Sequence, residues 1–256
     1  MNYAVCCIPV SPLRSEPSHK SEMVTQQLFG EPCSIIEKGE DHWVKIKCRY
    51  DGYEGWCQDG HITGIDETLF NMQPAGLTDA WMNVVYYNGD KMIVPAGCPM
   101  TGLQNGDALW NDNKIHFKGA LWNALDAKKE AEAIGQIAFN FINTSYLWGG
   151  KSVFGIDCSG FTQSVYKFLN VPLPRDTSQQ VLKGEVVGFL QEACFGDLAF
   201  FDNREGRITH VGILLNDHEI IHASVKVRID MIDSQGIINR DNYERTHQLR
   251  IIRRYF

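Results

Sequence analysis

Residues 208–224 read ITHVGILLNDHEIIHAS, two apolar runs joined by the turn-forming residues 216–218. Polar turn residues between two runs rich in β-branched side chains are typical of an antiparallel hairpin. A three-residue turn pairs His222 with Gly212, and period-two geometry then places His210 on the same face of the sheet as His222. Their Cα atoms would be diagonal neighbours, about 7–8 Å apart. A two-residue turn would instead put the two histidines on opposite faces.

Upstream of the hairpin, residues 155–160 read GIDCSG and lead into an apolar stripe with helical spacing, from Phe161 to Leu169. We therefore expect a helix that begins near Cys158. The unpaired N–H groups and the dipole at a helix N-terminus favour an anion. The pKa of a thiol there can fall from about 8.5 to roughly 3.5–7.5. The sequence thus predicts a nucleophilic cysteine.

Together, Cys158, His210 and His222 supply the residue types that covalent acyl transfer needs. His210 would take the thiol proton, and His222 would orient the imidazole of His210 in place of the more familiar carboxylate or amide. Two alternatives stay open. Each histidine can be an ordinary strand residue, and the three side chains together can hold zinc, although their spacing matches no compact ligand motif.

The rest of residues 125–256 predicts an α+β domain. A helical pattern begins at Asp126, the expected N-cap, and continues to Ile142. Beyond the second helix, strand-like runs follow at 197–201, 208–215, 219–223 and 225–229. Helices followed by an antiparallel sheet define this fold class.

Residues 1–65 and 66–124 have a different pattern, with short strands punctuated by turns. The alternating run 43–48 and the glycines around Tyr53 predict strands and a hairpin in the first segment, and Asn88-Gly89 predicts a hairpin in the second. We therefore expect two small all-β barrels before the α+β domain.

Composition narrows the classes of function. The chain has 256 residues, 24 Lys+Arg against 31 Asp+Glu and a net charge of −7, and it contains no basic block. These features argue against nucleic acid or an anionic membrane as a partner. The first residues lack the pattern of a signal peptide, and the eight cysteines include no C-x-x-C, so we expect a cytoplasmic protein with mostly reduced thiols. No cofactor is implied.

Five motifs, taken together and in order, resemble the NlpC-type papain-like peptidases of bacterial cell-wall metabolism. They are YLWGG (146–150), GIDCSGF (155–161), GDLAFF (196–201), THVGILL (209–215) and IIHAS (220–224). The resemblance covers about residues 126–256. It implies a papain-like α+β fold, with Cys158 as nucleophile, His210 as base and His222 as the third polar residue. It also implies hydrolysis of peptide bonds made by D-glutamate in murein peptides.

The N-terminal half resembles two bacterial SH3-like domains, as found in γ-D-glutamyl-L-diamino acid endopeptidases. The motifs are LRSEPS (13–18), TQQLFGE (25–31) and GYEGW (52–56). In that subgroup the first SH3-like domain closes over the active site and restricts it to peptides with a free N-terminal L-Ala. The resemblance implies that Glu31 and Tyr53 hold the alanine ammonium.

The same resemblance implies further site residues in the C-terminal domain. Those lining the substrate pocket would be Asp157, Ser159, Arg175, Asp176 and Thr177, with Thr177 standing where a serine is expected. Arg175 offers a planar fork for a substrate carboxylate. Tyr146 would assist the Cys158 backbone N–H in stabilising the developing oxyanion.

The leading hypothesis is therefore a cysteine endopeptidase that cleaves the γ-D-glutamyl to L-diamino acid bond of released murein peptides, a recycling role. A secreted hydrolase acting on intact murein, a murein-peptide binding module with an inactive peptidase domain, and acyl transfer to an amine are the alternatives. The sequence does not discriminate diaminopimelate from lysine in the substrate, and it leaves the oligomeric state open.

Overall fold

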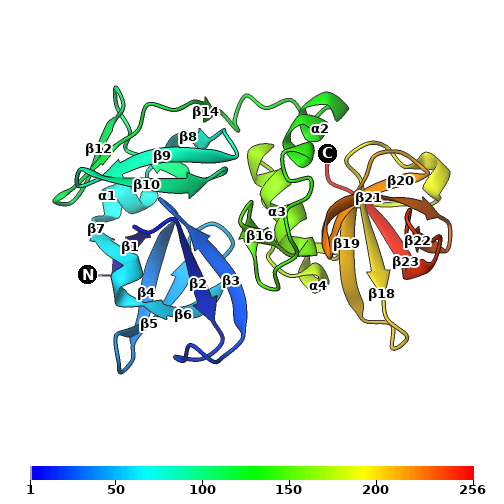
Figure 1. Cartoon of the computed structure of the whole chain (residues 1–256), viewed down its shortest axis with the longest axis horizontal. Helices are drawn as coiled ribbons and strands as arrows, with labels where there is room; N and C mark the ends of the chain where they lie inside the picture. Colours follow the sequence, from blue (N-terminus) through cyan, green and yellow to red (C-terminus); the bar gives the residue numbers. More distant parts are fainter. Residues whose placement is uncertain (1) are drawn as a thin grey trace. The chain divides into compact units, whose positions relative to one another are not determined.

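A computed structural model describes residues 2–256 of the chain. The chain divides into two compact units, one ending at Ala124 and the other spanning Leu125–Phe256. In Figure 1 the first unit runs from blue to green and the second from green to red. Within residues 2–256, no helix combines the length and the apolar character needed to cross a membrane.

The first unit begins with a seven-stranded antiparallel sheet in the order β3-β2-β6-β5-β4-β1-β7. Its elements are β1 (Tyr3–Cys6), β2 (Val10–Arg14), β3 (Met23–Leu28), β4 (Pro32–Lys38), β5 (Trp43–Cys48), β6 (Glu54–Gln58), the 3₁₀ turn η1 (Asp59–His61) and β7 (Ile62–Ile65). Leu13, Cys33, Val44, Ile46 and Cys57 pack into the core of this sheet. In β5 the apolar side chains of the alternating run 43–48 are buried, and the two lysines between them are more exposed.

The unit continues with one short helix and two smaller sheets. Their elements are α1 (Glu67–Asn71), β8 (Pro74–Thr78), β9 (Met82–Tyr87), β10 (Asp90–Pro95), β11 (Pro99–Thr101), β12 (Asp107–Trp110), β13 (Asn113–His116) and β14 (Leu121–Trp122). The sheet orders are β10-β9-β13-β12 and β11-β8-β14. The predicted hairpin at Asn88-Gly89 is confirmed, because β9 and β10 pair across it and both residues have positive φ.

One hydrophobic cluster joins the two halves of this unit. Phe29 and Ile65 from the first half pack with Val85, Trp110 and Phe117 from the second, and all five are buried. The rings of Phe29 and Trp110 lie with their centroids 5.0 Å apart. Residues on either side of position 65 therefore share a core.

The second unit has the helices first and the sheet afterwards, as expected for an α+β domain. Its elements are α2 (Ala131–Phe139), β15 (Lys151–Ser152), β16 (Gly155–Ile156), α3 (Cys158–Phe168), α4 (Thr177–Gln180), β17 (Glu185–Val187), η2 (Leu190–Glu192), β18 (Leu198–Asp202), β19 (Ile208–Leu214), β20 (Glu219–Ser224), β21 (Lys226–Asp233), β22 (Gly236–Ile238) and β23 (Arg245–Arg254). The strand order is β17-β23-β18-β19-β20-β21-β22.

This sheet closes on itself, because β22 pairs with both β21 and β23. Strands β18 to β23 thus form a closed antiparallel ring, and β17 extends it outside β23 (Figure 1, yellow to red). Phe201, Leu214, Ile220, Ile237 and Ile252 belong to its buried core. Closure leaves no open edge at β22, so this three-residue strand is paired on both sides.

The structure corrects the first helix of this unit. The helix predicted from Asp126 begins instead at Ala131, after Glu130, which makes no side-chain cap hydrogen bond. Ile134 and Ile137 are buried, whereas residues 128–130 are exposed. Helical residues without a packed face gain little stability, so the first predicted turn does not form.

Candidate active site

Cys158 is the first residue of helix α3, and Asp157 caps that helix. Asp157 Oδ1 accepts a hydrogen bond from the N–H of Gly160 at 2.7 Å, and Oδ2 accepts one from the N–H of Gly149 at 2.9 Å. A Cβ atom on Gly160 would lie 2.2 Å from the carbonyl oxygen of Gly150. Glycine at position 160 therefore lets the loop pack directly on the first turn of α3, which fixes the Cys158 backbone.

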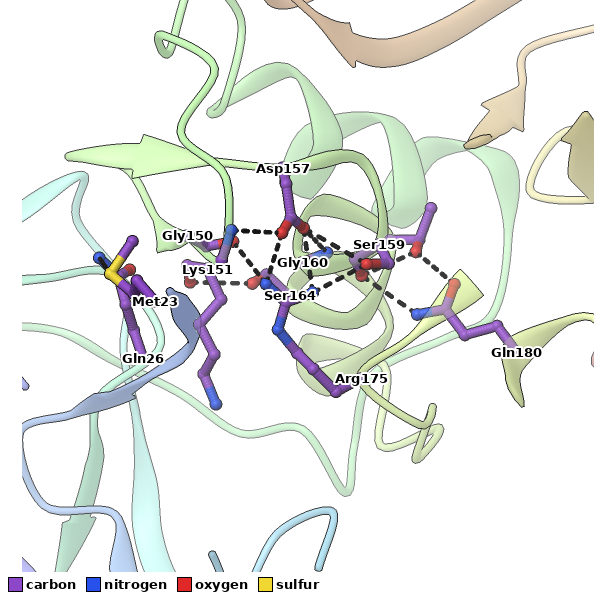
Figure 2. Close-up of polar contacts among 12 residues, drawn as sticks. Met23, Gln26, Gly150, Lys151, Asp157, Ser159, Gly160, Ser164, Arg175 and Gln180 are labelled. Carbon is purple, nitrogen blue, oxygen red and sulfur yellow. Dashed lines mark hydrogen bonds and ion pairs between the residues drawn. The ribbon is translucent and has the colours of Figure 1, made fainter. Parts of the chain in front are cut away.

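Arg175 binds this cap from the side, as Figure 2 shows. Its Nη2 lies 2.6 Å from Asp157 Oδ2, and its Nη1 lies 2.8 Å from Ser159 Oγ. Arg175 is only 2% exposed. It supplies the counter-charge that the buried Asp157 carboxylate requires. The guanidinium fork expected for a substrate carboxylate is thus engaged by Asp157, and substrate contact by Arg175, Asp157 or Ser159 stays a prediction.

The two histidines meet as the hairpin analysis predicted. Gly212 pairs with His222 across β19 and β20, which confirms the three-residue turn. His210 Nε2 and His222 Nδ1 lie 2.8 Å apart and share a hydrogen bond, with both side chains buried. A Cβ atom on Gly212 would lie 2.8 Å from the His222 Cβ, so the glycine provides the space that this contact needs.

Helix α3 packs on β19, which brings Cys158 to the strand that carries His210. The backbone N–H groups of Val211 and Ser159 donate hydrogen bonds to the Cys158 sulfur. The thiol therefore lies against the residue that follows His210 in the chain. Cys158 is 6% exposed and His210 is 6% exposed, so both side chains are largely shielded from water.

The protonation states differ from the sequence-based expectation. Burial, reinforced by the Asp157 carboxylate, raises the pKa of Cys158 to about 12, although the N–H of Val211 and the Arg175 charge oppose the shift. Burial, with the neighbouring His222 and His247, lowers the pKa of His210 well below its usual value. The expected lowering of the thiol pKa is therefore wrong for the free site, where desolvation outweighs the helix terminus. Near neutral pH the thiol of Cys158 and the imidazole of His210 are therefore both uncharged.

Other predicted residues of this unit lie around the helix. Tyr146 is half-buried, and burial, reinforced by the neighbouring Asp157 carboxylate, raises its pKa to about 12. Its hydroxyl therefore stays protonated and able to donate near neutral pH. Asp176 and Thr177 begin helix α4, and both are partly exposed.

Glu31 and Tyr53 belong to the other compact unit. Glu31 is 3% exposed, and its Oε2 accepts a hydrogen bond from the N–H of Leu28 at 2.9 Å. Tyr53 lies between β5 and β6, half-buried, with its backbone N–H donating to Asp51 Oδ1 at 3.0 Å. Their predicted role toward the substrate ammonium stays a prediction.

The geometry of the two imidazoles fits a hydrogen-bonded pair. Their facing nitrogens share one proton at 2.8 Å, whereas a shared metal would need both lone pairs directed at a common centre. Among residues 2–256, no group of three or more His, Cys, Asp or Glu side chains is arranged to hold a metal ion.

Sequence reasoning missed two residues beside the histidines. Asp230 Oδ2 lies 3.0 Å from His222 Nε2, on the side opposite His210. His247 stacks on His210 with ring centroids 4.1 Å apart and an angle of 25° between the planes. Asp230 could have been predicted from the register of the next strand pair. Arg228 on β21 pairs with His222, so Asp230, two residues further on, is a diagonal neighbour of His222. His247 gave no signal, since the mixed sequence of β23 has no clear alternation.

Sequence comparison matches two parts of the chain to known families. Residues 143–246 match the NlpC/P60 family, and residues 13–62 match the bacterial dipeptidyl-peptidase Sh3 domain. The second match contains both Glu31 and Tyr53.

Two curated proteins are similar over most of their length. The chain is 30% identical to the gamma-D-glutamyl-L-lysine dipeptidyl-peptidase of Bacillus subtilis (strain 168), over 78% of this chain and 71% of that protein. It is 25% identical to dipeptidyl-peptidase 6 of Lysinibacillus sphaericus, over 95% and 96% of the two chains. A solved NlpC/P60 family protein from Bacillus cereus ATCC 10987 shares the fold, with a TM-score of 0.81, 21% identity and 99% coverage of both chains.

Proposed function

The chain belongs to the NlpC/P60 family of cell-wall peptidases and carries a bacterial SH3 domain, and from this premise we propose that Cys158 is its catalytic nucleophile. The observation that carries the proposal is the buried hydrogen bond between His210 Nε2 and His222 Nδ1. Because this bond occupies Nε2 of His210, Nδ1 is the ring nitrogen that we propose faces the thiol of Cys158, at the N-terminus of α3.

The proposed reaction is hydrolysis through a thioester. The Cys158 sulfur attacks the γ-carbonyl carbon of D-glutamate while its proton passes to His210. The oxyanion is stabilised by the Cys158 backbone N–H and the Tyr146 hydroxyl. His210 then returns the proton to the leaving amine of the L-diamino acid, and water, activated by the same imidazole, releases the glutamyl product.

The neutral resting pair suits this sequence of steps. Because His210 is unprotonated and Cys158 is a thiol, proton transfer occurs during attack rather than before it. The N–H of Val211 and the Arg175 charge favour the developing thiolate. His210 becomes cationic only while the thioester forms, and His222 supports that charge.

We propose a murein peptide with a free N-terminal L-Ala as substrate. The curated relatives are named dipeptidyl-peptidases, which fits removal of the dipeptide L-Ala-D-Glu. A buried ammonium needs a carboxylate or an aromatic face, and Glu31 and Tyr53 supply these groups within the matched Sh3 segment. Asp176 and Thr177, at the start of α4, would contribute to the substrate pocket within the second unit.

The finer domain and cellular assignments are also part of this proposal. Residues 66–124 would be a second SH3-like domain that shares its core with the first, with boundaries at 65 and 124 as expected from the sequence. All eight cysteines are free thiols, which fits a reducing compartment and a cytoplasmic role in recycling murein peptides. Cell fractionation with an antibody to the chain tests the compartment.

The decisive experiment compares L-Ala-γ-D-Glu-diaminopimelate with its N-acetylated form, using the purified full chain and mass spectrometry. We expect the free peptide to yield L-Ala-D-Glu and diaminopimelate, and the acetylated peptide to react roughly 30-fold or more slowly, since a charged partner is lost. Cys158→Ala should abolish turnover while folding is retained. Glu31→Gln should slow the free peptide far more than the acetylated one.

The outcomes separate the parts of the proposal. Equal cleavage of both peptides keeps the peptidase and rejects the amine recognition by Glu31. Turnover retained in Cys158→Ala rejects the thiol mechanism. Cleavage of neither peptide by a folded chain rejects the function itself.

A further inference from the structure

The hydrogen bond between the two histidines is ambiguous by itself. A neutral imidazole carries one proton, so the 2.8 Å contact between His210 Nε2 and His222 Nδ1 can hold its hydrogen on either side. If His210 donates, its Nδ1 is a lone pair that can accept the thiol proton. If His222 donates, His210 carries its own proton on Nδ1 and cannot act as the base.

A carboxylate lies behind His222 at the place where this ambiguity can be resolved. Asp230 is 2% exposed, and its Oδ2 lies 3.0 Å from His222 Nε2. Its other oxygen, Oδ1, accepts hydrogen bonds from Arg228 Nη2 at 2.8 Å and from the backbone N–H of Arg240 at 2.9 Å. Two fixed donors therefore hold Oδ1, and Oδ2 faces the His222 ring.

Sheet register places Asp230 at this position. On the strand pair β20 and β21, Ile220 pairs with Asp230 and His222 pairs with Arg228. Residues 220 and 222 share a face, so Asp230 and His222 are diagonal neighbours on that face. The neighbouring Arg228 supplies the charge that keeps a buried carboxylate ionised.

We propose that Asp230 is a positioning residue that fixes the tautomers of both histidines, so that the unprotonated nitrogen of His210 faces Cys158; the consequence for catalysis rests on the proposed peptidase function. An ionised carboxylate can only accept, so His222 must carry its proton on Nε2. His222 Nδ1 then accepts from His210 Nε2, and His210 Nδ1 is left as the base.

The protonation states of Asp230 and His222 agree with this assignment. Although burial opposes it, the hydrogen bonds from His222, Arg240 and Arg228 hold the pKa of Asp230 at about 2. Burial lowers the pKa of His222, despite its bond to Asp230, so His222 is neutral and has one lone pair to offer. Because His222 stands where a carboxylate would, two imidazoles alone leave the direction of their hydrogen bond undefined. Asp230, the fourth residue of the series, defines it.

The amide variant gives the sharpest test. In Asp230→Asn the amide oxygen would occupy the Oδ1 position, because Arg228 and the Arg240 N–H both donate there. The NH₂ group would then face His222 Nε2 and force the opposite tautomer on both rings. In Asp230→Ala nothing dictates the tautomer, so the active one stays partly populated.

We expect Asp230→Asn to lower kcat by roughly 10²–10⁴ with little change in KM, as for a wrong tautomer in a catalytic triad. Asp230→Ala should lose less kcat while being the less stable protein, since it leaves a cavity and two unpaired donors. A purely structural role predicts the reverse order. Asp233→Asn, on the same strand and paired with Arg245 at the surface, is the matched control and should keep wild-type kcat.

Nitrogen-15 NMR of the histidines, without substrate, separates this inference from the proposed function. The wild type should show Nε2 protonated in both His210 and His222, and Asp230→Asn should show Nδ1 protonated in both. Wild-type spectra with the proton on His210 Nδ1, or an Asp230→Asn enzyme less impaired than Asp230→Ala, would overturn the assignment. The spectra remain decisive even if no murein peptide is cleaved.

Discussion

The thiol of Cys158 lies at a helix N-terminus and is almost completely buried. These two features have opposite effects on its pKa, since the helix N-terminus lowers it and burial raises it. Burial and the Asp157 carboxylate dominate, and they raise the pKa of Cys158 to about 12. In the free protein the thiolate is therefore a small fraction at neutral pH. Its fraction grows as pH rises above neutral, whereas a pre-formed thiolate and imidazolium pair would keep a constant thiolate fraction in that range.

Alkylation of Cys158 by iodoacetamide should therefore rise about tenfold per pH unit between pH 7 and 10, with no plateau at acid pH. The exposed thiol of Cys194 provides an internal reference in the same sample. The measurement is the rate of modification of each cysteine-containing peptide by mass spectrometry. A Cys158 rate that is already fast and constant from pH 5 to 8 would contradict the neutral pair.

At the scale of elements, the β19–β20 hairpin is the part that creates the histidine contact. Pairing of Gly212 with His222 puts an empty position beside the ring, and His210 reaches across it. The φ angle of Gly212 lies outside the left-handed region, so backbone conformation does not require a glycine here. The close approach of the neighbouring strand requires it.

Gly212→Ala should consequently lower both kcat and stability. The added Cβ would lie 2.7 Å from Ile220 Cδ1 and 2.8 Å from His222 Cβ, and overpacking of this kind costs about 1–3 kcal/mol. The matched control is Gly188→Ala, whose nearest neighbour would be 3.7 Å away. Turnover assays and thermal melts give the two readouts, and wild-type values for both in Gly212→Ala would reject the argument.

At the scale of the molecule, each compact unit has its own buried clusters. The cluster around Phe29 and Trp110 lies in the first unit, and the core of the closed ring lies in the second. Loss of packing in one unit should therefore weaken that unit first.

Phe29→Ala should destabilise the first unit by about 3–5 kcal/mol, because a fully buried ring beside Trp110 is removed. Amide hydrogen exchange should show faster exchange across β1 to β14 and unchanged protection in the closed ring. Leu109→Ala, at a side chain that is 60% exposed, should change stability by no more than about 0.5 kcal/mol. Equal loss of protection in both units would refute the separation of their cores.

Several local features of the site follow from the amino-acid pattern alone. A three-residue turn and the period of two predicted the pairing of His222 with Gly212, and the observed register excludes the two-residue turn that was the alternative. The start of helix α3 near Cys158 followed from the GIDCSG segment and the apolar stripe after it. The order of motifs indicated the family, which the comparisons confirm.

The surroundings of those elements depend on how distant segments of the chain pack together. Asp230 and His247 reach the histidines through strands β21 and β23, whose placement depends on ring closure at β22. The fold also brings Arg175 to Asp157, where the guanidinium neutralises the buried carboxylate. Burial also set the pKa of Cys158, since desolvation is a property of the packed protein and of no residue alone.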